Sequence, residues 1–332
     1  MRTMKSFASV ALLLACGGAA AAGLADRVTQ QDGWVAWQVP MVEGAGVPCC
    51  FDSHWHRGVC DLESSNWSFG TSDEDPQPAT AGDLGVYVHV AQGRIDRVRA
   101  LAASCTLRNT DKVRRLDAVA AADSVALLAG VAASAGKDFD SALSAAALHA
   151  DAGATRALEQ LAAAGHPQHL REQALFWLAQ ARGVEGARIV ERVASGDGDA
   201  ELRANAVFAL SQAHGIDGYA SIHAIAQHDA SEHVREQALF WMAQTGDARA
   251  KDDIVAAIDR DASPKVREQG VFALSQLKHG DADAALIALV RGRYPREVKR
   301  QALFWLGESG SEAALKFLDD VLTRADRKPA SG

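Results

Sequence analysis

The chain has 332 residues, enough for two or three domains of ordinary size, and 48% of them are hydrophobic, which excludes a disordered chain. The formal net charge of −8 argues against a general binder of nucleic acid or of anionic membranes. Ten Phe and seven Trp outnumber three Tyr, which is an unusual ratio for a globular protein.

Residues 1–25 have the features of a secretory signal peptide. Arg2 and Lys5 precede an apolar run from Phe7 to Ala15, and small residues follow it. Cleavage after Ala22 or after Ala25 fits the requirement for small residues at the cleavage site. The apolar run is too short to span a bilayer, so we expect export and no transmembrane helix.

Cys16 offers a second processing route. The segment Leu13-Leu14-Ala15-Cys16 is similar to the lipobox of bacterial lipoproteins, in which the cysteine is lipidated and becomes the mature N-terminus. Leu14 departs from that pattern, because a smaller residue is more common at its position. Both routes predict a periplasmic or cell-envelope protein, and the second adds a lipid anchor at Cys16.

Four further cysteines are expected to form two disulfides, because export permits them. They are Cys49, Cys50, Cys60 and Cys105. Four cysteines allow three pairings, and a bond between the neighbours Cys49 and Cys50 would be strained. Two pairings stay open, and each joins one of these neighbours to Cys60 and the other to Cys105.

An alternative for the Cys49–Cys60 segment is a metal-binding or catalytic site. His54 and His56 lie between the cysteines and are suitable metal ligands. The spacing matches no known zinc motif, and an oxidising compartment favours disulfides. We therefore assign no catalytic residue, metal ligand or cofactor.

Residues 26–110 are predicted to form a small β-rich module. Residues 34–39 favour a strand, and residues 86–90 and 95–99 indicate two strands joined by a hairpin loop. Residues 63–85 are rich in Ser, Asp, Pro and Gly, which predicts a long irregular loop. A module this small gains stability from disulfides.

Residues 165–324 repeat one pattern five times. In the first copy it is Leu170-Arg-Glu-Gln-Ala-Leu-Phe-Trp-Leu-Ala-Gln180, and it recurs every 32 residues without insertion. A second apolar series steps by the same interval, from Val190 to Leu318. Each copy is therefore predicted to be a pair of helices, called A and B below. The Phe of the A helices occupies one column: Phe176, Phe208, Phe240, Phe272 and Phe304.

Residues 111–164 are predicted to hold degenerate or capping repeats. Leu143 aligns with Leu175, which places a sixth helix pair at 133–164. Residues 111–132 are expected to form a capping unit with Ser124 as a helix N-cap. Residues 325–332 are predicted to be a tail.

The repeat resembles the HEAT repeat in its short form, the phycobilisome-lyase-type HEAT-like repeat. The matching residues in the first copy are Leu170-Arg171, Ala174 and Leu178. The resemblance implies a mostly α, right-handed α-solenoid of helix hairpins, and the whole chain is similar to exported bacterial HEAT-repeat proteins. Such a solenoid is expected to be a non-catalytic scaffold that binds a protein partner or another copy of itself.

In HEAT families an Asp lies six residues before the Arg, and the two form a ladder along the stack. Asp197, Asp229 and Asp261 occupy that position here. Gly165 and Arg293 replace the Asp at the two ends, so we expect the ladder to stop there. The His-Glu pairs that ligate iron in the HEAT-like deoxyhypusine hydroxylase do not occur in this sequence.

Residues after the repeated Phe alternate between large and small. They are Trp177, Ala209, Trp241, Ala273 and Trp305. A large residue facing a small one in the next repeat is typical of interdigitated packing. This alternation accounts for part of the Trp content.

The Phe column has two interpretations. On a helical wheel Phe176 falls 200° from the centre of the buried stripe at Ala174, between Glu172 and Gln180. The rings either seal the layer of A helices or form an exposed ladder that docks a partner, which the negative net charge predicts to be basic.

B helices are expected to line the concave side of the solenoid. Their outward positions carry charges at the two ends of the array and small residues between, which suits a shallow peptide groove. The binding candidates there are Arg188, Arg192, His223 and Asp252.

Overall fold

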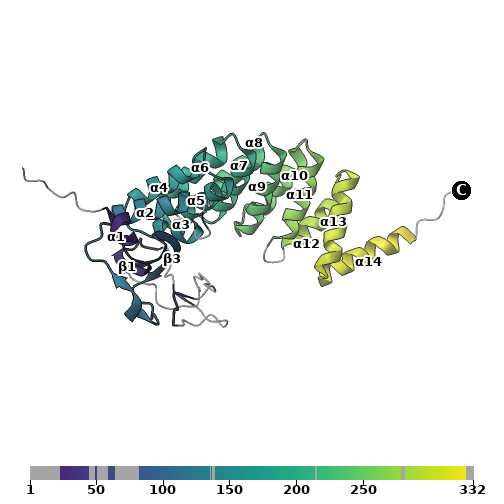
Figure 1. Ribbon diagram of the computed structural model, residues 1–332. Coiled ribbons are helices and arrows are strands. Elements are labelled where there is room, and N and C mark those ends of the chain that lie inside the picture. Colours follow the sequence, from purple (N-terminus) through teal and green to yellow (C-terminus); the bar gives the residue numbers. More distant parts are fainter. Residues whose placement is uncertain are drawn as a thin grey trace, which may run out of the picture.

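The computed structural model describes residues 23–44, 49–50, 59–63, 82–134, 136, 139–213, 215–277 and 281–326. Figure 1 shows a curved row of helix pairs with a small sheet at its N-terminal end. This is the predicted helical solenoid with a β-rich N-terminal module. The signal peptide, its lipidation candidate Cys16, and His54 and His56 lie outside the described residues.

The sheet has four strands in the order β3-β2-β1-β4. A short helix, α1 (Leu24–Thr29), leads into β1 (Gly33–Pro40), which pairs antiparallel with β2 (Asp83–Ala91). A tight turn joins β2 to β3 (Arg94–Ala102), which confirms the predicted hairpin. The short strand β4 (Arg114–Arg115) runs parallel to β1 and extends the sheet beyond the predicted boundary at residue 110.

The hairpin turn is fixed from outside by one carboxylate. Gln92 and Gly93 both have positive φ angles, of 53° and 70°, as a two-residue hairpin turn requires. Their backbone N–H groups donate to the carboxylate of Asp32, at 3.1 and 3.2 Å. The turn is therefore held against the residue that precedes β1.

Six helix pairs follow one lone helix, α2 (Ala121–Ala133). The degenerate pair is α3 (Phe139–Ala147) and α4 (Gly153–Ala162). The A helices of the five clear repeats are α5 (Gln168–Ala181), α7 (Ala200–Ser211), α9 (Glu232–Gln244), α11 (Pro264–Ser275) and α13 (Arg296–Ser309). Their B helices are α6 (Gly183–Gly196), α8 (Gly218–His228), α10 (Ala250–Arg260), α12 (Asp281–Arg291) and α14 (Glu312–Asp326).

Ser124 is not the N-cap that the sequence predicted. Helix α2 begins at Ala121, so Ser124 lies within its first turns and is fully buried. Its hydroxyl accepts a hydrogen bond from Trp37 Nε1 at 2.8 Å and lies 2.8 Å from His149 Nε2. A buried polar side chain needs such partners, and this need explains the position better than capping does.

The sheet closes the N-terminal end of the solenoid. One of its faces shares a single hydrophobic core with α2 and α3, through residues such as Val35, Val88, Leu128 and Leu143. The other face carries a separate small core that includes Trp34 and Cys60. The β-rich segment and the repeats are therefore packed as one continuous body at this end.

The predicted Asp-Arg ladder is present, and each rung joins two repeats. Arg203 donates two hydrogen bonds to Asp229, at 2.8 and 2.9 Å, and Arg235 pairs with Asp261 in the same way. Among the described residues Arg267 donates only to backbone carbonyls, because Arg293 stands where the next Asp would be. The ladder therefore stops at its C-terminal end as expected.

Candidate interaction surface

The A helices form the inner layer of the curved stack. Consecutive A helices pack against one another along their length, whereas consecutive B helices make only slight contact. In a curved stack the closely spaced layer lies on the inside, and Figure 1 shows α6 and α8 along the outer edge. The expectation that B helices line the concave side is therefore wrong.

An aromatic row runs along this inner layer. Phe176 and Phe208 stack with ring centroids 6.0 Å apart, and Phe208 meets Trp241 at 4.7 Å. The same two contacts recur 64 residues later, between Phe240 and Phe272 at 5.9 Å and between Phe272 and Trp305 at 5.0 Å. In order, the row is Trp177, Phe176, Phe208, Trp241, Phe240, Phe272, Trp305 and Phe304.

Both interpretations of the Phe column hold in part. The rings contact neighbouring repeats, as a sealing role requires. Phe176, Phe208, Phe240 and Phe272 are nevertheless only half-buried, and the side chain of Phe304 is 54% exposed. By contrast, Ala174 and Leu178 on the opposite side of α5 are fully buried. The row thus joins the repeats and also presents ring surface to solvent.

Three shallow recesses lie between the A helices beside the aromatic row, with volumes of about 300 to 360 Å³. The first is lined by Glu172, Gln173, Phe176, Asn205, Phe208 and Ala209. The second is lined by Glu201, Ala204, Asn205, Phe208, His233, Gln237 and Trp241. The third is lined by Glu236, Lys265, Glu268, Gln269, Phe272, Gln301 and Trp305. Each recess therefore combines aromatic rings, a side-chain amide and at least one carboxylate.

The amides of these recesses differ in their hydrogen bonding. Asn205 Nδ2 donates to Glu172 at 2.9 Å and to the carbonyl of Glu201 at 3.1 Å. Within the described part of the chain, the amides of Gln237, Gln269 and Gln301 have no hydrogen-bond partner. Half-buried amides without partners are available to a ligand.

The four B-helix candidates lie on the outer layer, apart from the aromatic row. Arg188 and Arg192 are exposed on α6, where Arg192 forms an ion pair with Glu159 at 2.9 Å. His223 of α8 contacts Gln227 at 2.7 Å, and Asp252 is exposed on α10. The structure does not bring these four residues together with the Phe column.

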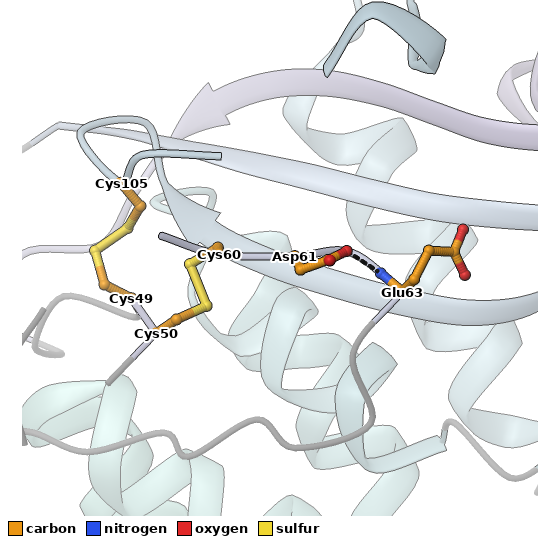
Figure 2. Close-up of a disulfide and its surroundings, with 6 residues drawn as sticks. All are labelled: Cys49, Cys50, Cys60, Asp61, Glu63 and Cys105. Carbon is orange, nitrogen blue, oxygen red and sulfur yellow. Dashed lines mark hydrogen bonds between the residues drawn. A yellow bond between two sulfur atoms is a disulfide. The ribbon is translucent and has the colours of Figure 1, made fainter. Parts of the chain in front are cut away.

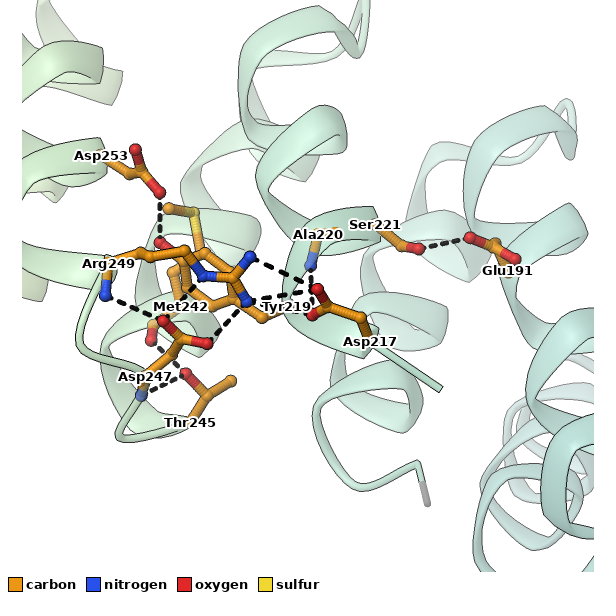
Figure 3. Close-up of polar contacts among 10 residues, drawn as sticks. All are labelled: Glu191, Asp217, Tyr219, Ala220, Ser221, Met242, Thr245, Asp247, Arg249 and Asp253. Carbon is orange, nitrogen blue, oxygen red and sulfur yellow. Dashed lines mark hydrogen bonds and ion pairs between the residues drawn. The ribbon is translucent and has the colours of Figure 1, made fainter. Parts of the chain in front are cut away.

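A polar cluster joins the second and third clear repeats at the loops before α8 and α10 (Figure 3). Arg249 pairs with Asp217 at 3.1 Å and with Asp247 at 2.7 Å, and its guanidinium lies 4.4 Å from the ring centre of Tyr219. Tyr219 donates to Asp253 at 2.7 Å, and burial, this bond and that carboxylate raise its pKa. The sequence analysis missed this cluster, because its members have no counterparts in the other repeats.

Cysteine pairing is the one alternative that the structure decides. Cys49 bonds Cys105 and Cys50 bonds Cys60, with Cα atoms 5.7 and 5.4 Å apart (Figure 2). These cysteines are thereby occupied and cannot ligate a metal. In the described ranges, no three His, Cys, Asp or Glu side chains are grouped closely enough to hold a metal ion.

Just beyond Cys60 a short turn fastens this disulfide-bonded segment to the sheet. Asp61 accepts a hydrogen bond from the backbone N–H of Glu63 at 3.0 Å. Glu63 in turn accepts from Trp34 Nε1 at 2.7 Å and from Arg97 at 2.6 Å. Hydrogen bonds from Trp34 and Arg97 hold the pKa of this carboxyl below its usual value.

Comparison with known proteins identifies the repeat but no activity. No curated protein matches the chain in sequence. Human deoxyhypusine hydroxylase is 16% identical, with a TM-score of 0.31 over 60% of this chain and 78% of that one. The Escherichia coli protein YibA is 18% identical, with a TM-score of 0.36 over 60% and 76%. Neither structure is similar enough to carry an inference about activity.

Along the described helices, none is long and apolar enough to cross a membrane. A family model described as HEAT repeats matches residues 219–303, which run from α8 into α13. That match supports a HEAT-repeat protein, as the 32-residue pattern predicted.

Proposed function

We propose that the protein is a non-catalytic scaffold of a bacterial cell envelope, which binds a partner protein through the inner face of its A helices. The observation that carries this proposal is the aromatic row. Its Phe rings are half-buried or exposed in every repeat, although each repeat has a fully buried core of its own. Aligned, partly exposed aromatic side chains are typical of protein-binding surfaces.

A protein partner suits this face better than a nucleic acid does. Glu172, Glu201, Glu236 and Glu268 line the recesses, where Lys265 is the lysine or arginine that faces them. Phosphate groups would be repelled by this arrangement. The outer-layer residues Arg188, Arg192, His223 and Asp252 stay a second candidate surface.

Export is part of the proposal. Two disulfides agree with an oxidising compartment such as the periplasm. Leu24 and Val28 of α1 are buried in the core, so cleavage after Ala22, or lipidation at Cys16, would keep this helix whole. Cleavage after Ala25 would remove Leu24. The mass of the mature N-terminal peptide from an envelope fraction distinguishes these routes.

The experiment that tests the binding face compares three forms of the full chain. Wild type, Phe240→Ser and Arg188→Ser are cross-linked in the native envelope, captured, and analysed by mass spectrometry. We expect a protein that is captured by wild type and Arg188→Ser and lost with Phe240→Ser. Phe304→Ser serves as a second variant, because this exposed ring at the end of the row can be removed without opening the core.

Identical captured proteins for wild type, Phe240→Ser and Phe304→Ser would contradict the proposal. Each variant is first compared with wild type in thermal unfolding. A folded variant that loses the partner supports the proposal, and a folded variant that keeps it does not.

A further inference from the structure

Repeat spacing of the inner face matches the spacing of an extended peptide. Packed helices lie about 8–10 Å apart, and an extended or polyproline-II chain advances about 3.1–3.3 Å per residue. Consecutive A helices are packed directly against each other. One repeat therefore corresponds to about three residues of a peptide laid across the A helices, so every third side chain meets an equivalent position.

Each recess offers the two groups that a lysine or arginine side chain needs. Phe272 and Trp305 supply an apolar wall in the third recess, and Glu236 and Glu268 supply carboxylates. The first recess repeats this combination with Phe176 and Glu172. The stem of a long basic side chain packs on an aromatic ring while its charged end pairs with a carboxylate.

Side-chain amides of the same face can bind the peptide backbone. Gln237, Gln269 and Gln301 occupy one column in three consecutive A helices, and within the described ranges each amide lacks a hydrogen-bond partner. Side-chain amides offer both a donor and an acceptor, as the backbone of an extended peptide requires. A column of amides thus gives affinity without depending on the peptide's sequence.

We propose that the inner face binds an extended cationic segment of a partner protein, with Lys or Arg at about every third residue. This inference rests on the proposed function, since it assumes that the inner face is the binding face, and it adds the chemistry of the partner. The carboxylates of the recesses select the charge of the segment, and the repeat spacing selects the interval between its basic residues.

Synthetic peptides test the inference. Three labelled 15-residue peptides are titrated with the full chain and followed by fluorescence anisotropy. One carries five Lys at every third position among Ala and Ser, the second has the same composition with the Lys in one block, and the third has Glu in place of Lys. We expect the evenly spaced Lys peptide to bind at least tenfold more tightly than either of the others.

Charge-neutralising variants locate the site. Glu236→Gln with Glu268→Gln is expected to weaken binding of the spaced Lys peptide at least fivefold. Asp252→Asn with Asp320→Asn removes the same charge from exposed positions on α10 and α14. This control is expected to change the affinity less than twofold. Equal losses in the two double variants would mean attraction by net charge alone and would overturn the inference.

Failure of this inference is distinguishable from failure of the proposed function. Equal affinity for the Lys and Glu peptides, or binding of neither, overturns the cationic segment. The proposed function still stands if Phe240→Ser loses a partner in the envelope. Sedimentation of the free chain covers a further occupant, because a dimer that Phe240→Ser dissociates would mean that a second copy covers the face and would also overturn the inference.

Discussion

At the scale of single residues, the alternation of Trp and Ala produces two kinds of junction between repeats. Where Ala209 or Ala273 follows the Phe, that Phe stacks on the Phe of the preceding repeat, at 6.0 or 5.9 Å. Where Trp241 follows, its ring leans on Phe208 of the preceding repeat at 4.7 Å. The sequence repeat of 32 residues is therefore a packing repeat of 64.

Ala209→Trp tests whether this alternation is required. Ala209 is 1% exposed, so a Trp there must displace the stacked rings of Phe176 and Phe208. Overpacking of this kind costs about 1–3 kcal/mol. We expect a loss of that size in the free energy of urea unfolding, and almost none for Ala224→Trp at an exposed position on α8. Equal stability of the two variants would contradict the packing argument.

At the scale of helices, the ladder carboxylates join three elements at once. Asp229 accepts two hydrogen bonds from Arg203 of α7, and it also accepts one from the backbone N–H of Ser231 before α9, at 2.8 Å. Burial alone would raise the pKa of Asp229, but the bonds from Arg203 and Ser231 hold it below its usual value. The side chain is 7% exposed, so its removal leaves a largely buried guanidinium unpaired.

Asp229→Ala is expected to cost about 3 kcal/mol, because breaking a largely buried charged pair leaves the partner unsatisfied. The control is Asp320→Ala, an exposed carboxylate on α14, which should change stability by no more than about 0.5 kcal/mol. Urea unfolding of both variants measures the difference. A loss below 1 kcal/mol for Asp229→Ala would show that the ladder contributes little to joining the repeats.

Of the two disulfides, the one that closes the longer loop is expected to stabilise the N-terminal segment more. Cys49–Cys105 spans 56 residues and Cys50–Cys60 spans 10. In the chain-entropy model, removing them costs about 4 and about 3 kcal/mol. The test is the free energy of unfolding of Cys49→Ser/Cys105→Ser and of Cys50→Ser/Cys60→Ser, with peptide mapping to confirm the remaining bond. A larger loss in the second pair would contradict the loop-length argument.

At the scale of the whole molecule, predictable features are those written in a local pattern. The helix pairs follow from a strict 32-residue period, and the hairpin of β2 and β3 follows from two strand-like runs around Gln92–Gly93. The strand β4 has no such signal, because its two residues pair only where β1 is already in place. The cysteine pairing likewise depends on which segments meet in space.

Curvature was beyond the sequence for a similar reason. Both A and B helices carry an apolar stripe, and that stripe marks the buried side without telling which layer is more closely spaced. Close contact between consecutive A helices decides this point, and it moves the candidate surface from Arg188 and His223 to the Phe column. The Phe column itself was found from the sequence, because five identical residues outside the apolar stripe have no role in the core of their own helix.

A buried histidine connects the sheet to the helices at the closed end of the solenoid. His149 is fully buried, and its Nδ1 lies 2.7 Å from the carbonyl of Ala145. A carbonyl only accepts, so Nδ1 donates and Nε2 of the neutral ring accepts from the Ser124 hydroxyl, which is bonded to Trp37 of β1. This chain of hydrogen bonds requires a neutral imidazole.

Stability is therefore expected to fall in mild acid. Burial lowers the pKa of His149, as does Arg182, and these effects exceed the opposite effects of the Ala145 carbonyl and Asp151. The unfolded chain, with a histidine pKa of about 6.5, thus binds the proton more readily than the folded protein does. The contribution of neutral His149 is complete above about pH 6.5 and is lost progressively as the pH falls below that value.

His149→Gln separates this effect from the titration of the other histidines. The free energy of urea unfolding is measured between pH 8 and pH 5, for the variant and for the wild type, with Trp fluorescence as the signal. We expect the variant to be less stable at pH 8, because the hydrogen bonds to Ser124 and Ala145 are disturbed, and to lose less stability than wild type on acidification. The two curves should therefore converge toward pH 5, since protonation removes from the wild type the contribution that the variant already lacks. Parallel curves over this range would mean that His149 keeps its proton affinity on folding, and the sheet would then be joined to α2 and α3 by apolar contacts that do not respond to pH.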